Sequence, residues 1–149
     1  MSITCGYCGQ PAKFEPSSAH IYGGRDYGPV WDCRPCDAYV GCHPDGSPKG
    51  VLANKTRRLA RRRAHEFFDP LWQDWQPVYP ERQKLSGKLR NLMRVRAYEW
   101  LAHHMGLPFD DTHIAMFDET QCERVVDLIR EHSATAATVR EWAKARRAA

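Results

Sequence analysis

Apolar side chains recur at intervals of three and four residues through most of the chain after residue 50. This spacing places them on one face of an α-helix, so it predicts a series of amphipathic helices. Pro70, Pro77 and Pro80 interrupt the pattern among aromatic residues, and we interpret residues 69–80 as a joint between two halves. The expected helices are residues 51–68, 82–105, 118–131 and 134–147.

Residues that favour helix ends stand at the boundaries of these segments. Gly106 follows the second helix as a C-terminal stop, because glycine readily adopts a positive φ. Asp118 and Gln121 have the spacing of a capping box at the start of the next helix. Ser133 is the expected N-cap of the last helix.

The first part of the chain has a different pattern, in which short β-prone runs alternate with glycine-containing turns. Such runs predict an antiparallel sheet of short strands. About 50 residues bury little apolar surface, so this part needs a further source of folding free energy. The runs are residues 12–14, 19–22, 30–32 and 38–42.

Two Cys-x2-Cys turns can bind a metal ion that supplies this folding free energy. Cys5 and Cys8 form the first pair, and Cys33 and Cys36 form the second pair after 24 intervening residues. Zinc prefers four soft ligands in a tetrahedron, and two such turns complete one closed site. We therefore predict a zinc ribbon over residues 1–50, folded around one structural Zn²⁺. The whole chain is expected to be an α+β protein, in which this ribbon packs on a bundle of about four helices within residues 51–149.

The remaining cysteines have less specific settings. Cys42 and His43 follow the last β-prone run and could add a fifth ligand or replace one. We favour a buried strand thiol beside a surface histidine, because structural zinc sites normally stop at four ligands. Cys122 shares its apolar spacing with Val125 and Ile129, which favours a place in the helical core.

Length and composition exclude several classes of protein. The chain has 149 residues, of which 27% are charged, so a large multidomain enzyme is excluded. No window approaches the roughly 18 uncharged apolar residues of a membrane span, and residues 1–10 lack the basic start and apolar stretch of a secretory signal. Without such a signal we expect a cytoplasmic protein. In this reducing compartment clustered cysteines bind metal instead of forming disulfides.

Charge is segregated along the chain. The formal net charge of +4 falls to about +2 when four thiolates and one Zn²⁺ are counted, so its distribution matters more than its sum. Residues 46–65 contain seven basic residues and no acid, and residues 82–98 form a second window without acids. Residues 110–131 have the opposite character, with a local balance of −5.

The first basic window falls on the helix expected over residues 51–68, largely on the side away from its apolar stripe. Several guanidinium groups on one face favour a polyanionic partner such as nucleic acid, because arginine matches the geometry of phosphate. A solvated helix face that also pairs with the acidic segment is the alternative. The residues expected to contact phosphate are Lys49, Lys55, Arg57, Arg58, Arg61, Arg62 and Arg63.

The joint order of several motifs is more specific than any one of them. They are Cys5-x2-Cys8-Gly9, Trp31-Asp32-Cys33-x2-Cys36, Ala38-Tyr39-Val40-Gly41-Cys42-His43, Phe68-Asp69-Pro70-Leu71-Trp72, Arg96-x-Tyr98-x-Trp100 and His113-Ile114-x-Met116-Phe117-Asp118. In this order the chain resembles the small zinc-finger-containing proteins of bacteriophages and prophages. The resemblance implies zinc binding by the four cysteines of the two turns and a phage setting in the host cytoplasm, but it brings no established reaction.

We expect a zinc-binding protein that binds nucleic acid, DNA or RNA, through the arginine-rich helix and the ribbon. Tyr7, Tyr22 and Tyr27 could stack on unpaired bases, whereas Trp31 is expected in the core of the ribbon. The alternative is a protein-binding regulator or inhibitor of a host nucleic-acid machine, such as RNA polymerase or a defence nuclease.

An enzyme is not expected. His65, Glu66, Asp69, Asp74 and His113 could be assembled into the metal site of a nuclease, but their spacing matches no known metallohydrolase motif. A zinc ion held by four thiolates has no open position for a reacting water molecule.

Overall fold

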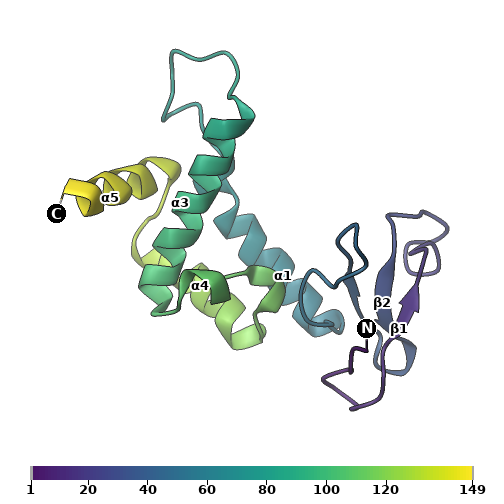
Figure 1. The fold of residues 1–149 in the computed structure, drawn as a ribbon. Coiled ribbons are helices and arrows are strands. Elements are labelled where there is room, and N and C mark those ends of the chain that lie inside the picture. Colours follow the sequence, from purple (N-terminus) through teal and green to yellow (C-terminus); the bar gives the residue numbers. More distant parts are fainter. Residues whose placement is uncertain (1, 149) are drawn as a thin grey trace. The chain divides into compact units, whose positions relative to one another are not determined.

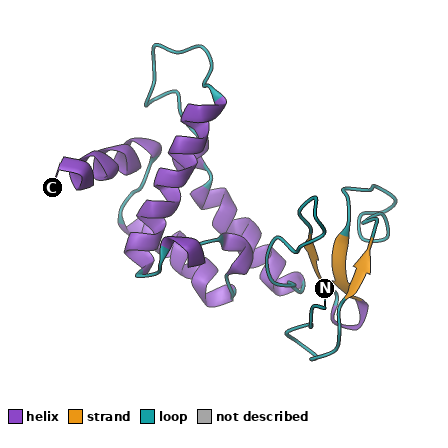
Figure 2. Cartoon of the chain, viewed as in Figure 1, coloured by secondary structure: helices purple, strands orange, loops and turns teal. Residues whose placement is uncertain are grey.

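The structure, a computed structural model, describes residues 2–148. Its strands lie early in the chain and its long helices follow (Figure 1; Figure 2). The chain is therefore an α+β protein, as predicted. It divides into two compact units, Met1–Leu59 and Ala60–Ala149, and each is described by itself. No helix within residues 2–148 has the length and apolar character needed to cross a membrane.

The first unit contains an antiparallel sheet of three strands, β1 (Lys13–Glu15), β2 (Val30–Cys33) and β3 (Ala38–Gly41). Strand β2 lies in the centre and is buried along its whole length. Trp31 of β2 lies opposite Phe14 of β1 and Val40 of β3. Its indole nitrogen donates a hydrogen bond to the carbonyl of Gly46 at 3.0 Å, and the placement of Trp31 in the core is confirmed.

The apolar core of this unit is small. Two of its members are cysteines of the Cys-x2-Cys turns, so the side chains proposed to bind zinc also fill the interior. A fully buried aliphatic side chain contributes only about 1.5–3 kcal/mol, so this core needs the help of a metal. The core residues are Cys5, Trp31, Cys33, Ala38, Val40 and Leu52.

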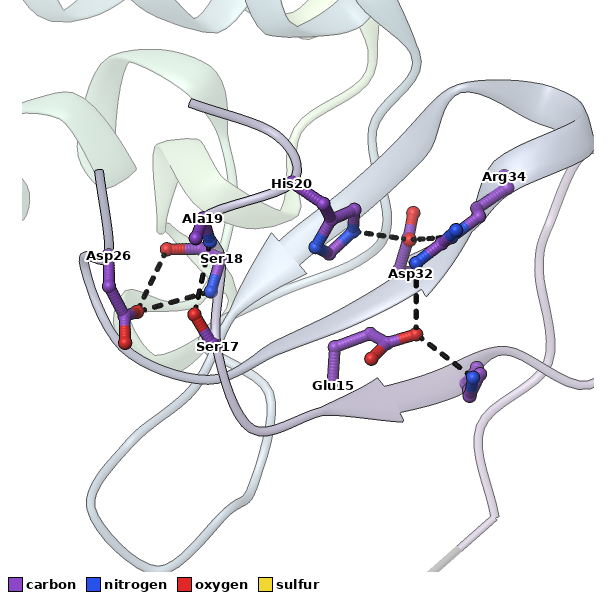
Figure 3. A network of polar contacts seen from close by, with 9 residues as sticks. Glu15, Ser17, Ser18, Ala19, His20, Asp26, Asp32 and Arg34 are labelled. Carbon is purple, nitrogen blue, oxygen red and sulfur yellow. Dashed lines mark hydrogen bonds and ion pairs between the residues drawn. The ribbon is translucent and has the colours of Figure 1, made fainter. Parts of the chain in front are cut away.

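Residues 19–22 form turns and not the expected strand. The carbonyl of Ser18 accepts a hydrogen bond from the N–H of Ile21 at 2.9 Å. The carboxylate of Asp26 accepts hydrogen bonds from the N–H groups of Gly28 and Ser18, at 2.8 and 3.2 Å, and these bonds lower the pKa of Asp26. Figure 3 shows Asp26 and Ser18 in this arrangement. The prediction of a strand is wrong because local bonds occupy the groups that a sheet would need.

Helices account for most of the rest of the chain. They are α1 (Lys55–Phe68), α2 (Pro70–Gln73), α3 (Gly87–Met105), α4 (Glu119–Glu131) and α5 (Ala136–Ala148). Helix α3 begins later than residue 82, because the hydroxyl of Ser86 caps it by accepting a hydrogen bond from the N–H of Leu89 at 3.2 Å.

Helix α1 also begins later than expected. Ala53 still pairs with Tyr39 of β3, which keeps the chain extended up to that point. The side chain of Asn54 then accepts a hydrogen bond from the N–H of Arg57 at 3.0 Å and caps the helix. The expected start at residue 51 is therefore corrected to Lys55.

The proline-rich segment 69–80 does not separate the two units. Pro70 begins α2, because proline is tolerated in the first turn of a helix. Leu71 and Val78 are buried within the second unit, at 2% and 6% exposure. The interpretation of this segment as a joint between halves is corrected, since the segment packs as part of the second unit.

The second unit has the larger core, to which α1, α3, α4 and α5 all contribute. Phe68 and Phe117 are almost wholly buried there, and Cys122 lies among them, as expected. Leu59 of α1 is 53% exposed, because the packed stripe of the helix runs through Ala64 and Phe68.

The ends of two helices test the expected signals. Gly106 ends α3 with a φ of +68°, which confirms it as the C-terminal stop. Ser133 is not an N-cap, because its φ of +46° is left-handed whereas N-cap residues are extended, and α5 begins only at Ala136. Thr135 caps α5 in its place, accepting a hydrogen bond from the N–H of Thr138 at 3.3 Å.

The capping box of α4 is expected to stabilise the second unit. Asp118 accepts a hydrogen bond from the N–H of Gln121 at 2.8 Å, and the side chain of Gln121 accepts one from the N–H of Asp118 at 3.0 Å, as predicted. Asp118→Ala removes the first bond and should lower the free energy of unfolding by about 1 kcal/mol. Chemical denaturation measures this, with Glu123→Ala on the same helix as control. Equal losses in both variants would contradict the role of the cap.

Candidate metal centre

Two tight turns hold the four cysteines of the first unit. In the first turn the N–H of Cys5 donates to the carbonyl of Gln10 at 2.8 Å, and Gly9 completes the loop with a φ of +75°. The second turn begins where β2 ends at Cys33 and continues as the 3-10 turn Arg34–Cys36. The sheet therefore fixes one pair of cysteines, and a closed loop presents the other.

The four sulfur atoms form one compact cluster. The Sγ atoms of Cys5, Cys8, Cys33 and Cys36 all lie within 4.8 Å of one another, and those of Cys8 and Cys33 are 3.7 Å apart. A zinc ion with four Zn–S bonds of about 2.3 Å spaces its sulfurs roughly 3.8 Å apart in a regular tetrahedron. The cluster therefore fits one structural zinc ion, as predicted.

The thiols influence one another's ionisation. Burial raises the pKa of Cys5, but hydrogen bonds from the backbone N–H groups of Cys8 and Tyr7 outweigh it and lower this pKa to about 7. The neighbouring Cys8 raises the pKa of Cys36 to about 12, and burial adds to the effect. Burial also raises the pKa of Cys33. A dication at the centre favours all four thiolates at once, which is the form that binds zinc.

The chemistry of this donor set is that of a structural site. Cys5 and Cys33 are buried, Cys36 is half-buried and Cys8 is exposed. Four thiolates complete the tetrahedral shell that zinc prefers and leave no position for water or substrate. The centre is therefore suited to join the two turns of the ribbon.

The other residues considered as ligands lie elsewhere. Cys42 is half-buried beyond the end of β3, beside the exposed His43, and neither belongs to the cluster. His65 Nδ1 lies 3.0 Å from a carboxylate oxygen of Asp69. Within residues 2–148 the four cysteines are the only group of three or more side chains placed to bind one metal ion.

A polar network links β1, β2 and the turn that follows β2 (Figure 3). Asp32, which is 5% exposed, contacts His20 Nε2 at 2.9 Å and Arg34 Nε at 3.5 Å. Glu15 contacts Arg34 at 3.4 Å and Lys13 at 3.2 Å, and the hydrogen bond from Lys13 lowers the pKa of Glu15. Because Arg34 lies inside the second cysteine turn, the network positions that turn. The sequence carries no signal for it, since its members come from separate segments.

Arg58, expected to contact phosphate, is engaged within the first unit. Its guanidinium carbon lies 4.1 Å from the centre of the Tyr39 ring. Its Nη1 donates to the carbonyls of Ala53 and Asp37, at 2.7 and 2.5 Å, and its Nη2 contacts the Asp37 carboxylate at 3.2 Å. These contacts assign Arg58 to the stability of the ribbon, and its contact with phosphate stays a prediction.

Two more of the expected arginines have protein partners. The guanidinium carbon of Arg57 lies 5.3 Å from the centre of the Tyr7 ring, and the Tyr7 hydroxyl accepts a hydrogen bond from the N–H of Asn54 at 3.1 Å. In the second unit, Arg61 Nε donates to the carbonyl of Phe117 at 3.0 Å. Both side chains are half-buried, so they are less accessible to a polyanion than the sequence indicates.

Four cations of the expected set are exposed. Lys55 and Arg62 are seven positions apart on α1, so they share one face of the helix. Arg63 follows directly, with its guanidinium carbon 5.6 Å from the Phe67 ring. The structure shows no ion pair for any of the four within residues 2–148. These exposed cations are Lys49, Lys55, Arg62 and Arg63.

Comparison with known proteins gives one result. The model of a family described as a zinc-finger-containing domain matches residues 1–132. No curated protein and no solved structure matches the chain. The matched range includes all four cysteines of the cluster and ends before α5.

Proposed function

The chain belongs to the family of zinc-finger-containing domains, and from this premise we propose that it is a zinc-dependent nucleic-acid-binding protein. The zinc ion orders the ribbon, and exposed basic side chains contact phosphate. The likeness to phage and prophage proteins favours a role in the cytoplasm of a bacterial host. The protein acts by binding and not by catalysis, because a closed four-thiolate site cannot activate water.

The observation that carries the proposal is the group of exposed cations Lys49, Lys55, Arg62 and Arg63, none of which has an ion pair within residues 2–148. A cation that pairs with a carboxylate already has an opposite charge beside it. These four side chains have none in the described chain and can pair with an anionic partner. Each phosphate that they neutralise would release condensed counterions, so binding should weaken steeply with salt.

The ribbon adds groups that can contact bases. Tyr27 is 67% exposed and accepts a hydrogen bond from Arg25 Nη1 at 3.4 Å, which places a cation beside an accessible ring. Tyr22 lies next to it, with 4.9 Å between the ring centres. Aromatic rings of this kind stack on unpaired bases with little regard to sequence. Tyr7 is less suited, because it is only 36% exposed and the Arg57 guanidinium group lies over its ring, whereas Arg25 contacts only the hydroxyl of Tyr27. Trp31 is buried.

The triple variant Lys55→Gln, Arg62→Gln and Arg63→Gln tests the proposal. Fluorescence anisotropy with labelled single-stranded DNA and RNA of about 20 nucleotides should show micromolar binding by the natural chain. Three lost phosphate contacts should weaken this binding at least about tenfold and reduce the slope of log K against log salt by about 2. Lys84→Gln, Lys88→Gln and Arg90→Gln remove the same charge from other exposed positions and serve as the control.

Two results would contradict the proposal. One is an equal loss in the test and control variants, because binding would then follow net charge and not α1. The other is the absence of binding to DNA and RNA at low salt.

The second candidate function is a regulator or inhibitor that binds a host nucleic-acid machine. It is favoured by the acidic segment, in which Asp110, Asp111, Glu123 and Asp127 are exposed and show no ion pair in the described chain. A surface of this kind attracts a basic partner such as a nucleic-acid-binding protein. Absence of oligonucleotide binding, together with a stable complex with such a host protein, would favour this function.

A further inference from the structure

A groove with a volume of about 780 Å³ lies between α3 and α5 in the second unit. Leu92 and Arg96 line it from α3, Trp142 and Arg147 line it from α5, and Phe109 lines it from the segment after α3. A second hollow of about 510 Å³ shares Leu92, Arg96 and Arg147, so the two form one continuous surface. Figure 1 shows α5 beside α3.

The lining of the groove includes exposed apolar side chains. Leu92 is 38% exposed and Phe109 is 41% exposed, and both face the same hollow. Val95 and Leu107 add partly buried apolar surface to the lining. Apolar side chains that remain exposed together in a concave surface are typical of a site that a partner covers.

Basic side chains surround this apolar surface. Arg96 and Arg147 show no ion pair or side-chain hydrogen bond within residues 2–148, and Glu99 is the only acidic residue in the described lining of either hollow. A partner with negative charge is therefore favoured. The basic lining residues are Arg96, Arg140, Lys144, Arg146 and Arg147.

The aromatic rings of the groove distinguish between two kinds of acidic partner. The Trp142 ring has the guanidinium carbon of Arg146 at 4.8 Å and the ring centre of His103 at 5.5 Å. The Tyr79 ring likewise has the guanidinium carbon of Arg140 at 5.1 Å. A guanidinium group lies over each of these half-buried rings, so they are poorly placed to stack on bases, whereas the exposed Leu92 and Phe109 suit apolar side chains of a peptide.

We propose that the groove between α3 and α5 binds an acidic amphipathic helix of a partner protein. Apolar side chains at helical spacing would contact Leu92 and Phe109, and glutamates or aspartates beside them would pair with Arg96 and Arg147. The inference goes beyond nucleic-acid binding by α1. It also goes beyond the family, because α5 lies outside the matched residues 1–132.

The test uses a synthetic peptide and the zinc-loaded full chain. The peptide has about 18 residues, or roughly five helical turns, with leucines at helical spacing and glutamates on its other positions. A fluorescein label reports binding by anisotropy. The natural chain should bind this peptide but not a shuffled peptide of the same composition, because shuffling destroys the apolar face.

Variants of the groove should weaken peptide binding at least about tenfold, as expected for the centre of an interface. Phe109→Ser is compared with Met116→Ser, which changes an apolar residue that is 52% exposed outside the groove. Arg96→Gln with Arg147→Gln is compared with Lys88→Gln with Arg90→Gln, which removes equal charge. The control variants, and the α1 variant that weakens nucleic-acid binding, should leave peptide binding unchanged.

Amide chemical shifts provide a readout that needs no substitution. Peptide-induced changes concentrated in α3 and α5 support the proposal, and changes concentrated elsewhere overturn it. Equal binding of the intended and shuffled peptides also overturns it, as does absence of binding. An oligonucleotide that displaces the peptide, and whose own binding depends on Arg96 and Arg147, would assign the groove to nucleic acid and overturn the peptide proposal.

Discussion

Cys33→Ser is expected to abolish zinc binding and to unfold the first unit. Cys33 contributes one of the four clustered sulfurs and is also buried in the small core of the ribbon. A serine hydroxyl stays protonated and is a poor zinc ligand, so the closed site cannot form. Structural zinc supplies on the order of 10 kcal/mol of folding free energy in small modules, which exceeds what this core could replace.

The measurement is a heteronuclear NMR spectrum of the full chain together with its zinc content. Amide signals of residues 2–59 should lose their dispersion, while those of the second unit, which has its own core, should keep theirs. Chelation of zinc from the natural chain should have the same effect. Cys42→Ser is the matched control, because Cys42 lies outside the cluster. A folded first unit in zinc-free protein would refute the role assigned to the metal.

Phe68→Ala is expected to destabilise the second unit by about 3–5 kcal/mol. Phe68 is 0% exposed, and its ring centre lies 4.6 Å from that of Tyr98. Removing the ring leaves a cavity that the surrounding helices can fill only in part, and the packing against Tyr98 is lost. Because small domains are stable by only about 5–15 kcal/mol, this variant should be close to unfolding at ambient temperature.

Urea denaturation followed by helical circular dichroism measures the effect on the second unit. Phe109→Ala is the control, since the same ring is removed from a position that is 41% exposed. The control should change the free energy of unfolding by less than about 1 kcal/mol. Similar losses in the two variants would show that Phe68 is not part of the tightly packed core.

Features that depend on neighbouring residues could be predicted well. The capping box of Asp118 and Gln121 and the stop at Gly106 were found where the spacing placed them, because their hydrogen bonds join residues within one helical turn. Ser133 shows the limit of the same reasoning. It is a favourable N-cap residue, but Thr135 is another two positions later, and the chain uses the second.

The ends of helices and strands were harder to predict where side chains or distant strands form hydrogen bonds with the backbone groups that the expected element would use. Residues 19–22 are β-prone, but the bonds made by Ser18 and Asp26 favour turns. Helix α1 starts late because Ala53 pairs with Tyr39, a residue in another part of the sequence. The β propensity of a segment takes no account of the hydrogen bonds that residues outside it make, whether these residues are neighbours or distant in sequence.

The candidate metal centre and the candidate nucleic-acid surface differ in the same way. Two pairs of cysteines, Cys5 with Cys8 and Cys33 with Cys36, were sufficient to predict a zinc site. Two Cys-x2-Cys turns in one chain have few structural uses other than binding zinc. For the basic helix the sequence predicted the positive charge, but not which of the basic side chains remain accessible to a partner. Arg58 and Arg61 bind carbonyl groups of the protein, at Ala53 and Phe117 respectively.

The sequence alone was thus enough for the zinc ligands, the α+β class and several helix ends, since each depends on short-range spacing. Only the tertiary structure showed which arginines are engaged and that α3 and α5 enclose a groove. Those properties depend on contacts between residues far apart in the chain. A charged residue on the polar face of a helix has the same local pattern whether it faces solvent or a carbonyl of another segment, so packing alone decides between them.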